Sequence, residues 1–187
     1  ESVERDCKGI IFVEGVEDIK FITHISNELS KSNYIPKNIS DAKIMIIPMG
    51  GCDSLKFWIQ SDLANKYGIP YFVFLDSDKG TAEELKQSKR KNDLESEGII
   101  VCLTRKREIE NYIHPSLLPD GIVLNDLDDA KKILGSAFNI RKNKALSTFI
   151  DDMTAEMIRE VEEYEEEKIK RHEFTDFFNE IYDVIGH

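Results

Sequence analysis

The sequence lacks the features that mark membrane, secreted and strongly basic proteins. No apolar run approaches the roughly 18 residues that a membrane-spanning helix needs, and no charged-then-apolar segment resembles a secretory signal. We therefore expect a cytoplasmic protein without membrane contact. Basic residues are also few, since 25 Lys and Arg stand against 36 Asp and Glu, a net charge of -11. Taken alone, this balance argues against a protein that wraps nucleic acid through a basic surface.

Cysteine is sparse, and its spacing forms no pattern. Cys7, Cys52 and Cys102 lie far apart, with no CxxC pair and no paired histidines near them. This spacing argues against a disulfide framework and against a zinc site. It fits a protein of a reducing compartment.

Two nucleotide-binding motifs are missing. The sequence has no G-x-x-x-x-G-K-[ST] phosphate loop, so any ATPase that works with this chain lies outside it. It also has no G-x-G-x-x-G after its first apolar run, which disfavours a dinucleotide site. The first residue is Glu1 rather than Met, and we expect the chain to be a piece of a longer protein.

What remains is the composition of a globular protein. The chain has 187 residues, of which 41% are hydrophobic and 33% charged, enough for one compact domain or one domain with an appendage. The acidity is concentrated, because residues 151–167 hold nine carboxylates and one base. The rest of the chain is therefore close to neutral.

Short apolar runs alternate with segments of helical spacing. We expect strands at 9–13, 43–47, 71–75 and 99–103, and helices at 16–31, from a cap at Asp53 or Ser54, and at 82–97. Strands that are apolar along their whole length indicate a parallel sheet covered by helices on both faces.

The pattern changes after residue 104. We expect short helices near 126–135 and 143–150, a long charged helix over about 151–171, and a final helix with an apolar face. The predicted fold class is therefore α/β, a compact parallel sheet flanked by helices. We divide it into an α/β core at 1–115 and a mainly helical extension at 116–187 that completes the domain.

Polar residues follow the expected strands at the point where each strand ends. Glu14 and Asp18 follow the first strand, Gly50-Gly51 the second, and Asp76 and Asp78 the third. Ligands bind beyond the carboxyl ends of parallel strands, and clustered carboxylates suit Mg²⁺ or Mn²⁺. Two such ions can clamp the attacking and leaving oxygens of a phosphodiester. Each motif alone has a simpler reading, as a tight turn or a surface ion pair.

Three of these segments together resemble the Toprim domain of topoisomerases, primases, recombination proteins and several nucleases. They are Val-Glu-Gly-Val-Glu-Asp at 13–18, Pro-Met-Gly-Gly at 48–51 and Phe-Leu-Asp-Ser-Asp at 74–78. A later run, Arg-Glu-Ile-Glu-Asn-Tyr at 107–112, resembles the Toprim half of OLD-family ATP-dependent nucleases, including the Gabija type. The resemblance covers about residues 9–113 and implies a Toprim-like fold with metal-dependent cleavage of DNA.

The resemblance also implies roles for individual residues. The implied ligands of two Mg²⁺ or Mn²⁺ ions are Glu14, Asp18, Asp76, Asp78, Glu108 and Glu110. Of these, Glu14 and Asp76 are our predicted catalytic acids. OLD-like nucleases place a basic residue after the core, for which Lys170 or Arg171 is the best match. A basic helix end that offsets the helix dipole is the alternative reading of that pair.

The expected substrate is DNA, with RNA as a second possibility. We assign nucleic-acid contacts to Gly50, Gly51, Lys89, Arg90, Arg105 and Arg107. With two ions bound, the basic clusters near the strand ends would make the local field positive despite the net charge. Expected partners are an ATPase domain or subunit outside this chain and a second copy of the chain, in a DNA-processing or anti-phage protein.

Two other readings stay open. The run after the third strand superficially resembles the nucleophile loop of haloacid-dehalogenase phosphatases, although that family carries it on its first strand. Covalent aspartyl-phosphate formation would distinguish that class. A non-enzymatic Toprim module that only binds a partner is the second, and metal-dependent plasmid cleavage lost in Asp76→Ala would exclude it.

Overall fold

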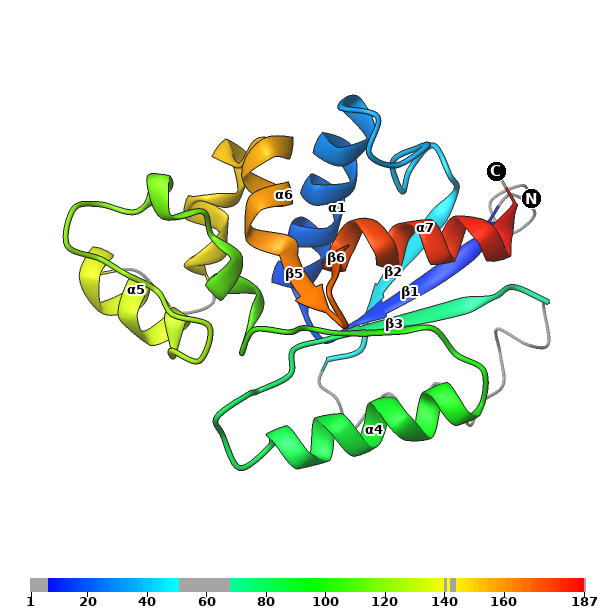
Figure 1. Ribbon diagram of the computed structural model, residues 1–187, viewed down its shortest axis with the longest axis horizontal. Coiled ribbons are helices and arrows are strands. Elements are labelled where there is room, and N and C mark those ends of the chain that lie inside the picture. The colour runs from blue at the N-terminus through cyan, green and yellow to red at the C-terminus, as the bar shows by residue number, and fades with distance from the viewer. Residues whose placement is uncertain (1–6, 51–67, 140, 142–143, 187) are drawn as a thin grey trace.

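The computed structural model describes residues 7–50, 68–139, 141 and 144–186. A parallel sheet of four strands stands at its centre (Figure 1), in the order β2-β1-β3-β4. The strands are β1 Gly9–Val13, β2 Ile44–Pro48, β3 Tyr71–Leu75 and β4 Val101–Leu103. The predicted α/β class with a parallel sheet is confirmed.

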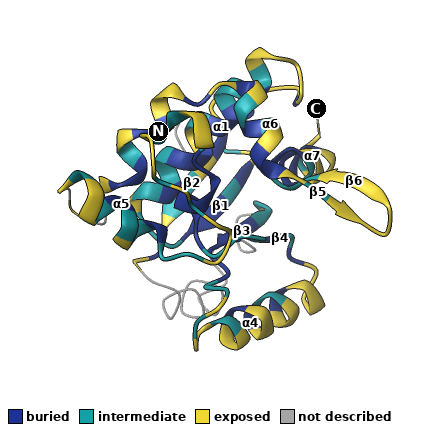
Figure 2. Cartoon of the chain, turned by 60° about the vertical axis from the view of Figure 1, so that its left-hand side comes forward, coloured by how far each residue is buried: buried dark blue, intermediate teal, exposed yellow. Residues whose placement is uncertain are grey.

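Both faces of this sheet are buried, which explains why the strands are apolar throughout. Phe72 and Phe74 of β3 pack into one core, and Val73 and Leu75 into a second one. Helices α1 (Val16–Lys31) and α7 (Glu173–Ile185) lie on one side of the sheet, with α6 (Ala155–Glu162) beside α1, and α4 (Glu84–Ser96) lies on the other (Figure 1). Figure 2 shows β1 and β3 largely buried and the outer face of α4 exposed.

The long helix expected over 151–171 is wrong. Helix α6 ends at Glu162, and an antiparallel hairpin of β5 (Glu163–Glu166) and β6 (Ile169–His172) follows. The turn residues Glu167 and Lys168 both adopt positive φ, 51° and 66°, as a two-residue hairpin turn requires. Neither is Gly or Asn, so the sequence carries no turn signal there.

A buried carboxylate fixes where α6 ends and α7 begins. Glu162 has no exposed surface and accepts hydrogen bonds from the backbone N–H groups of Phe174 (2.7 Å) and Thr175 (2.8 Å). It also accepts one from the Thr175 hydroxyl at 2.6 Å. Burial raises the pKa of Glu162, while these donors act in the opposite direction. The hairpin is therefore held at both ends by one side chain.

The segment between the sheet and α6 consists of short elements. They are the 3-10 turns η1 (Ile109–Tyr112) and η2 (Pro115–Leu117), helix α5 (Ala130–Phe138), and the turns η4 (Leu146–Thr148) and η5 (Ile150–Asp152). The helix expected after Asp53 or Ser54 lies outside the described residues. No helix in the described ranges is both long and apolar enough to span a bilayer.

Four aromatic rings join α1, β3 and η1 to the last helix, α7. Phe21, Phe74, Tyr112 and Phe174 contact one another with ring centroids 4.8–6.3 Å apart. Helix α7 thus shares a core with β3. The proposed division at 115/116 stays a prediction.

Candidate active site

The carboxyl edge of the sheet gathers the predicted acids. Glu14 follows β1, and Asp18 lies in the first turn of α1, where its Oδ2 accepts a hydrogen bond from Gly15 N at 2.7 Å. Gly15 has an extended backbone, with φ -148°, so the turn does not itself demand glycine. Asp18 is buried, and this bond fixes it at the helix start.

Asp76 stands at the centre of the edge. It is 9% exposed, and its Oδ1 accepts a hydrogen bond from Ile109 N at 3.0 Å. Burial raises the pKa of Asp76 well above its usual range, and the charges of Asp18, Glu110 and Glu14 raise it further. Carboxylates from β1, α1, β3 and η1 therefore act on one another.

The loop after β4 delivers the other two acids. Glu108 is 8% exposed, and Glu110 is completely buried. Neither carboxylate oxygen of Glu110 accepts a hydrogen bond from a described group. Burial raises the pKa of Glu110 to about 7. A buried carboxylate without donors is unstable in its charged form unless a cation compensates it.

Lys131 supplies that cation. Its Nζ lies 3.4 Å from Asp76 Oδ2, 3.2 Å from Glu108 Oε2 and 3.3 Å from Glu110 Oε2. The backbone N–H of Lys131 also donates to Glu108 Oε1 at 2.8 Å. Burial alone would lower the pKa of Lys131, but these carboxylates raise it. We call Asp76, Glu108, Glu110 and Lys131 the acid–lysine cluster.

Sequence reasoning missed Lys131. It lies in the first turn of α5, capped by the Asp129 side chain on Lys132 N, 21 residues after Glu110. No motif marks it, since Lys131-Lys132 reads as an ordinary basic pair. Only the return of α5 to the sheet edge places the ammonium among the acids.

The cluster bears on metal binding. In the described ranges, no three His, Cys, Asp or Glu side chains are arranged closely enough to hold a metal ion. The Lys131 ammonium occupies the point where the carboxylates of Asp76, Glu108 and Glu110 converge. It takes there the place that a metal ion would have. Hard oxygen donors, and a buried pair of Glu110 oxygens without hydrogen bonds, suit Mg²⁺ or Mn²⁺ in that place.

Gln87 of α4 contacts two further predicted acids, Glu14 and Asp78. Gln87 Nε2 of α4 donates to Asp78 Oδ2 at 2.9 Å and to Glu14 Oε1 at 3.4 Å. Arg90, one turn further along, donates to Gln87 Oε1. Arg90 is 8% exposed and bound to Gln87, and the nucleic-acid contact expected of it stays a prediction. The neighbouring Lys89 is exposed.

The other residues predicted to contact nucleic acid are Gly50, Gly51, Arg105 and Arg107. Gly50 has φ +73° and donates its N–H to Glu14 O at 3.1 Å, while Gly51 lies outside the described residues. Arg105 and Arg107 are half-buried and lie near Asp126 (3.6 Å) and Asp129 (3.8 Å). Their carboxylate partners reduce the charge that they offer to a phosphate, and their contacts with nucleic acid stay predictions.

Lys170 and Arg171 lie on the exposed hairpin. Lys170 Nζ pairs with Glu163 Oε1 at 2.8 Å, and Arg171 Nε lies 4.0 Å from Glu166 Oε2. Among the described residues, Lys131 and not one of these two pairs with the acids of the acid–lysine cluster. Because both pair with acids of the hairpin itself, a catalytic part for Lys170 or Arg171 stays a prediction.

The geometry agrees with the similarity of this chain to known proteins. Residues 7–78 match the family model described as "Overcoming lysogenization defect protein-like, TOPRIM domain". The matched segment includes Glu14, Asp18, Asp76 and Asp78, which meet at the sheet edge. Residues 7–78 of this chain are therefore similar to an OLD-like Toprim domain.

Solved structures extend the likeness beyond residues 7–78. The C-terminal region of the Burkholderia pseudomallei OLD protein has a TM-score of 0.56 at 15% identity, over 96% of this chain and 99% of that one. The C-terminal region of the Xanthomonas campestris pv. campestris OLD protein, phased with iodine, has 0.55 at 16%, over 96% of both. At such identity these similarities establish the fold alone. No curated protein matches the chain.

The Toprim match supports a nuclease-type function. Toprim domains generally bind divalent metals, and the oxygen-rich edge described above is of the chemical type that such ions require.

Proposed function

We propose that this Toprim domain is a metal-dependent endonuclease that hydrolyses phosphodiester bonds of DNA. The observation that carries the proposal is the gathering of buried carboxylates at one sheet edge around the Lys131 ammonium. Glu110 accepts no hydrogen bond from a described group there, although it is fully buried. Such an arrangement costs stability, and a cation site explains why it is kept.

The acids would divide between two positions. Glu108, Glu110 and Asp76 surround the ammonium, while Glu14 and Asp78 share the Gln87 amide. Asp18 acts on Asp76 from the start of α1. All six would hold two Mg²⁺ or Mn²⁺ ions, which supply an activated water and neutralise charge on the phosphate.

The chain's own groups prepare this site. Lys131 compensates the carboxylates before an ion arrives. Gln87 and Arg90 fix the orientation of Asp78 and Glu14, and the Ile109 N–H fixes that of Asp76. Positioning of this kind keeps the acids from turning toward solvent.

The longer protein around this domain is part of the proposal. Because the similar solved structures are C-terminal regions of OLD proteins, we infer an ATPase domain or subunit outside this chain, in a cytoplasmic DNA-processing or anti-phage protein. Dimerisation through this domain is a further expectation.

The test is a cleavage assay on supercoiled plasmid and on structured RNA with Mg²⁺, Mn²⁺, Ca²⁺ or EDTA. We expect Mg²⁺- or Mn²⁺-dependent nicking of the plasmid that EDTA and Glu14→Ala both abolish. Glu17→Ala is the matched control, because it removes a nearby carboxylate that accepts a hydrogen bond from the Ser147 hydroxyl and is not one of the proposed metal ligands. Cleavage that survives EDTA and Glu14→Ala would contradict the proposal.

The alternatives give other outcomes of the same assay. Cleavage of RNA but not plasmid would favour a Toprim ribonuclease. Metal binding without cleavage of either would favour an interaction module. Label transferred from a phosphate ester to Asp76 would favour phosphatase chemistry.

A further inference from the structure

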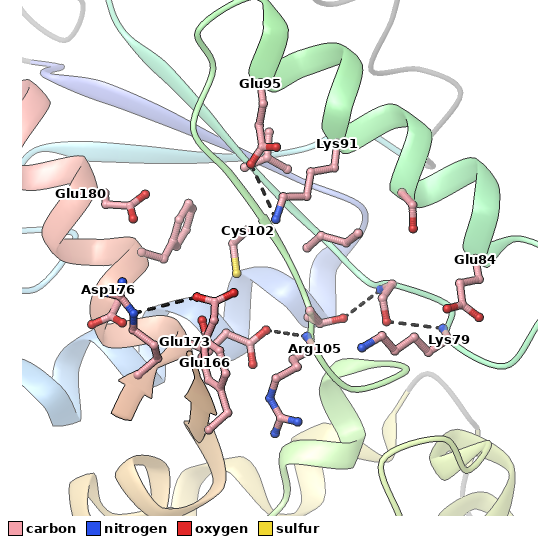
Figure 3. A pocket seen from close by; sticks show the side chains of 18 residues that line it. Lys79, Glu84, Lys91, Glu95, Cys102, Arg105, Glu166, Glu173, Asp176 and Glu180 are labelled. Atoms are coloured by element: carbon pink, nitrogen blue, oxygen red, sulfur yellow. Dashed lines mark hydrogen bonds and ion pairs between the residues drawn. The ribbon is translucent and has the colours of Figure 1, made fainter. Parts of the chain in front are cut away.

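The outer edge of β4 borders a pocket. β4 is the last strand in the sheet order, so one of its edges has no neighbouring strand among the described residues. A cavity of about 470 Å³ lies along this edge, with residues 101–104 as its floor (Figure 3). Helix α4 forms one wall, and α7 with the hairpin forms the other. We call this cavity the β4 trench.

The trench exposes backbone groups that can still pair. Alternate residues of a strand turn their N–H and C=O groups to opposite sides. Ile100 O accepts from Val73 N at 3.1 Å, and Thr104 N donates to Leu75 O at 2.9 Å. The backbone groups of residues 100, 102 and 104 therefore face β3. The groups of Val101 and Leu103 therefore point into the trench, where they have no hydrogen bond within the described part of the chain.

An edge strand with such groups is a template for another extended chain. Proteins protect such edges with charges or coverage, and here the two helical walls leave a space between them. The cavity volume falls within the range of ligand sites. An added strand would fit where the next strand of the sheet would lie.

The lining of the trench is acidic. Its carboxylates are Glu84, Glu95, Glu166, Glu173, Asp176 and Glu180, against four basic residues. Several are already engaged, as in the pair of Lys91 and Glu95 at 3.6 Å. Glu180 forms no hydrogen bond or close ion pair with any described residue, although the charges of Lys91 and Arg171 act on it. The α7 wall therefore offers negative charge to an occupant.

Asp176 and Glu180 define the spacing of that charge. They lie one helical turn apart on α7 and face the trench (Figure 3). Four residues of a helix rise about 6 Å, and two residues of a strand advance about 6.6 Å. Basic side chains at alternate positions of an added strand would therefore meet both carboxylates.

This lining also excludes a nucleic-acid strand as occupant, because phosphates would meet carboxylates. An uncharged apolar segment would bring no cation to Glu180, and none to Asp176, which accepts a hydrogen bond from His172 N at 3.1 Å. We propose that the β4 trench binds an extended protein segment that adds a fifth strand at β4 and directs Lys or Arg at alternate positions toward α7. Such binding is independent of cleavage, since it uses none of the acids at the candidate active site.

The trench does come close to that site. Ser77 and Lys79 line one end of it, and they are the chain neighbours of Asp76 and Asp78. A bound segment would thus approach the acids without replacing any of them.

The test is selection of peptides from a phage-displayed random dodecapeptide library on the 187-residue chain. Enriched peptides are synthesised, and their dissociation constants are measured. We expect Lys or Arg at alternate positions, and binding at least about tenfold weaker to Glu180→Lys. Asp183→Lys makes the same charge change on α7 outside the trench lining, and it should bind like the wild type.

A backbone variant tests strand addition directly. Leu103→Pro removes an N–H that points into the trench and keeps the bonds of residues 102 and 104 to β3, and edge strands tolerate such a proline. We expect a folded protein by circular dichroism that has lost peptide binding. Peptide should also slow amide exchange of Val101 and Leu103 in the wild type. No enriched peptide, or equal binding to folded Leu103→Pro, would overturn the proposal.

Discussion

The Nζ atom of Lys131 lies 3.3 Å from Glu110 Oε2, a carboxylate with no exposed surface. The same ammonium contacts Asp76 and Glu108. One side chain from α5 thus compensates acids that come from the end of β3 and from the loop after β4. Because an ammonium and a divalent ion cannot share one position, this contact links the acid–lysine cluster to metal affinity.

Lys131→Met should increase that affinity. Removal of the competing charge leaves the three carboxylates to a divalent ion, and we expect the dissociation constant for Mn²⁺ to fall about tenfold, or about 1.4 kcal/mol. Isothermal titration calorimetry measures it, and Mn²⁺ should raise the melting temperature of the variant more than that of the wild type. Lys132→Met, at an exposed neighbour, is the control. Unchanged or weaker Mn²⁺ binding by Lys131→Met would refute competition.

Glu110→Gln should change how stability depends on pH in the presence of EDTA. Glu110 has a folded pKa of about 7, above the ordinary value of 4.5. The folded state therefore holds this proton more tightly than the unfolded state does. The stabilisation that the bound proton gives is fully present below pH 4.5 and is lost as the pH rises through 7. We expect the free energy of unfolding of Glu110→Gln, relative to that of the wild type, to increase by on the order of 3 kcal/mol between pH 4 and pH 8.

Chemical denaturation at both pH values measures this difference. Glu167→Gln, the same substitution at an exposed position of the hairpin turn, is the control. A constant difference between Glu110→Gln and the wild type across this range would mean that folding does not raise the pKa of Glu110.

Tyr112→Phe should destabilise the fold. The Tyr112 hydroxyl donates to Glu173 Oε2 at 2.6 Å and accepts from Lys106 N at 2.9 Å. Loss of the hydroxyl leaves the half-buried Glu173 carboxylate with one donor fewer, at a cost of about 1–3 kcal/mol. Tyr164→Phe, which keeps its ring under Arg105, should cost less than about 0.5 kcal/mol. Equal effects in urea denaturation would show that the Tyr112–Glu173 bond contributes nothing.

Arg90→Ala and Lys89→Ala should separate a structural from a surface role. Arg90 is buried and supports Gln87, so its loss should cost about 1–3 kcal/mol of unfolding free energy. Lys89→Ala should change stability by less than about 0.5 kcal/mol and weaken DNA binding at low salt. Thermal denaturation and a salt-dependent binding assay measure the two effects. A stable Arg90→Ala variant with weakened DNA binding would support the surface interpretation.

The sequence alone determined the sheet and one edge of it. Runs such as Tyr71–Leu75, apolar at every position, are required when both faces of a parallel sheet are buried. Since parallel strands end at the same edge, the order of the strands along the chain was enough to assign Glu14, Asp18, Asp76 and Asp78 to one place. The Toprim resemblance rested on those same local segments, and the family match at residues 7–78 confirms it.

Tertiary structure decided the rest, because the interactions concerned are long-range. The hairpin after Glu162 depends on a buried carboxylate that holds Thr175, 13 residues later, and the charged sequence between them reads as a helix. Arg90 belonged to a basic cluster in the sequence, yet α4 turns it toward Gln87 and away from solvent. Lys131 had no motif at all. It lies 55 residues from Asp76, and only the packing of α5 against the sheet edge makes it the counterion of the acids.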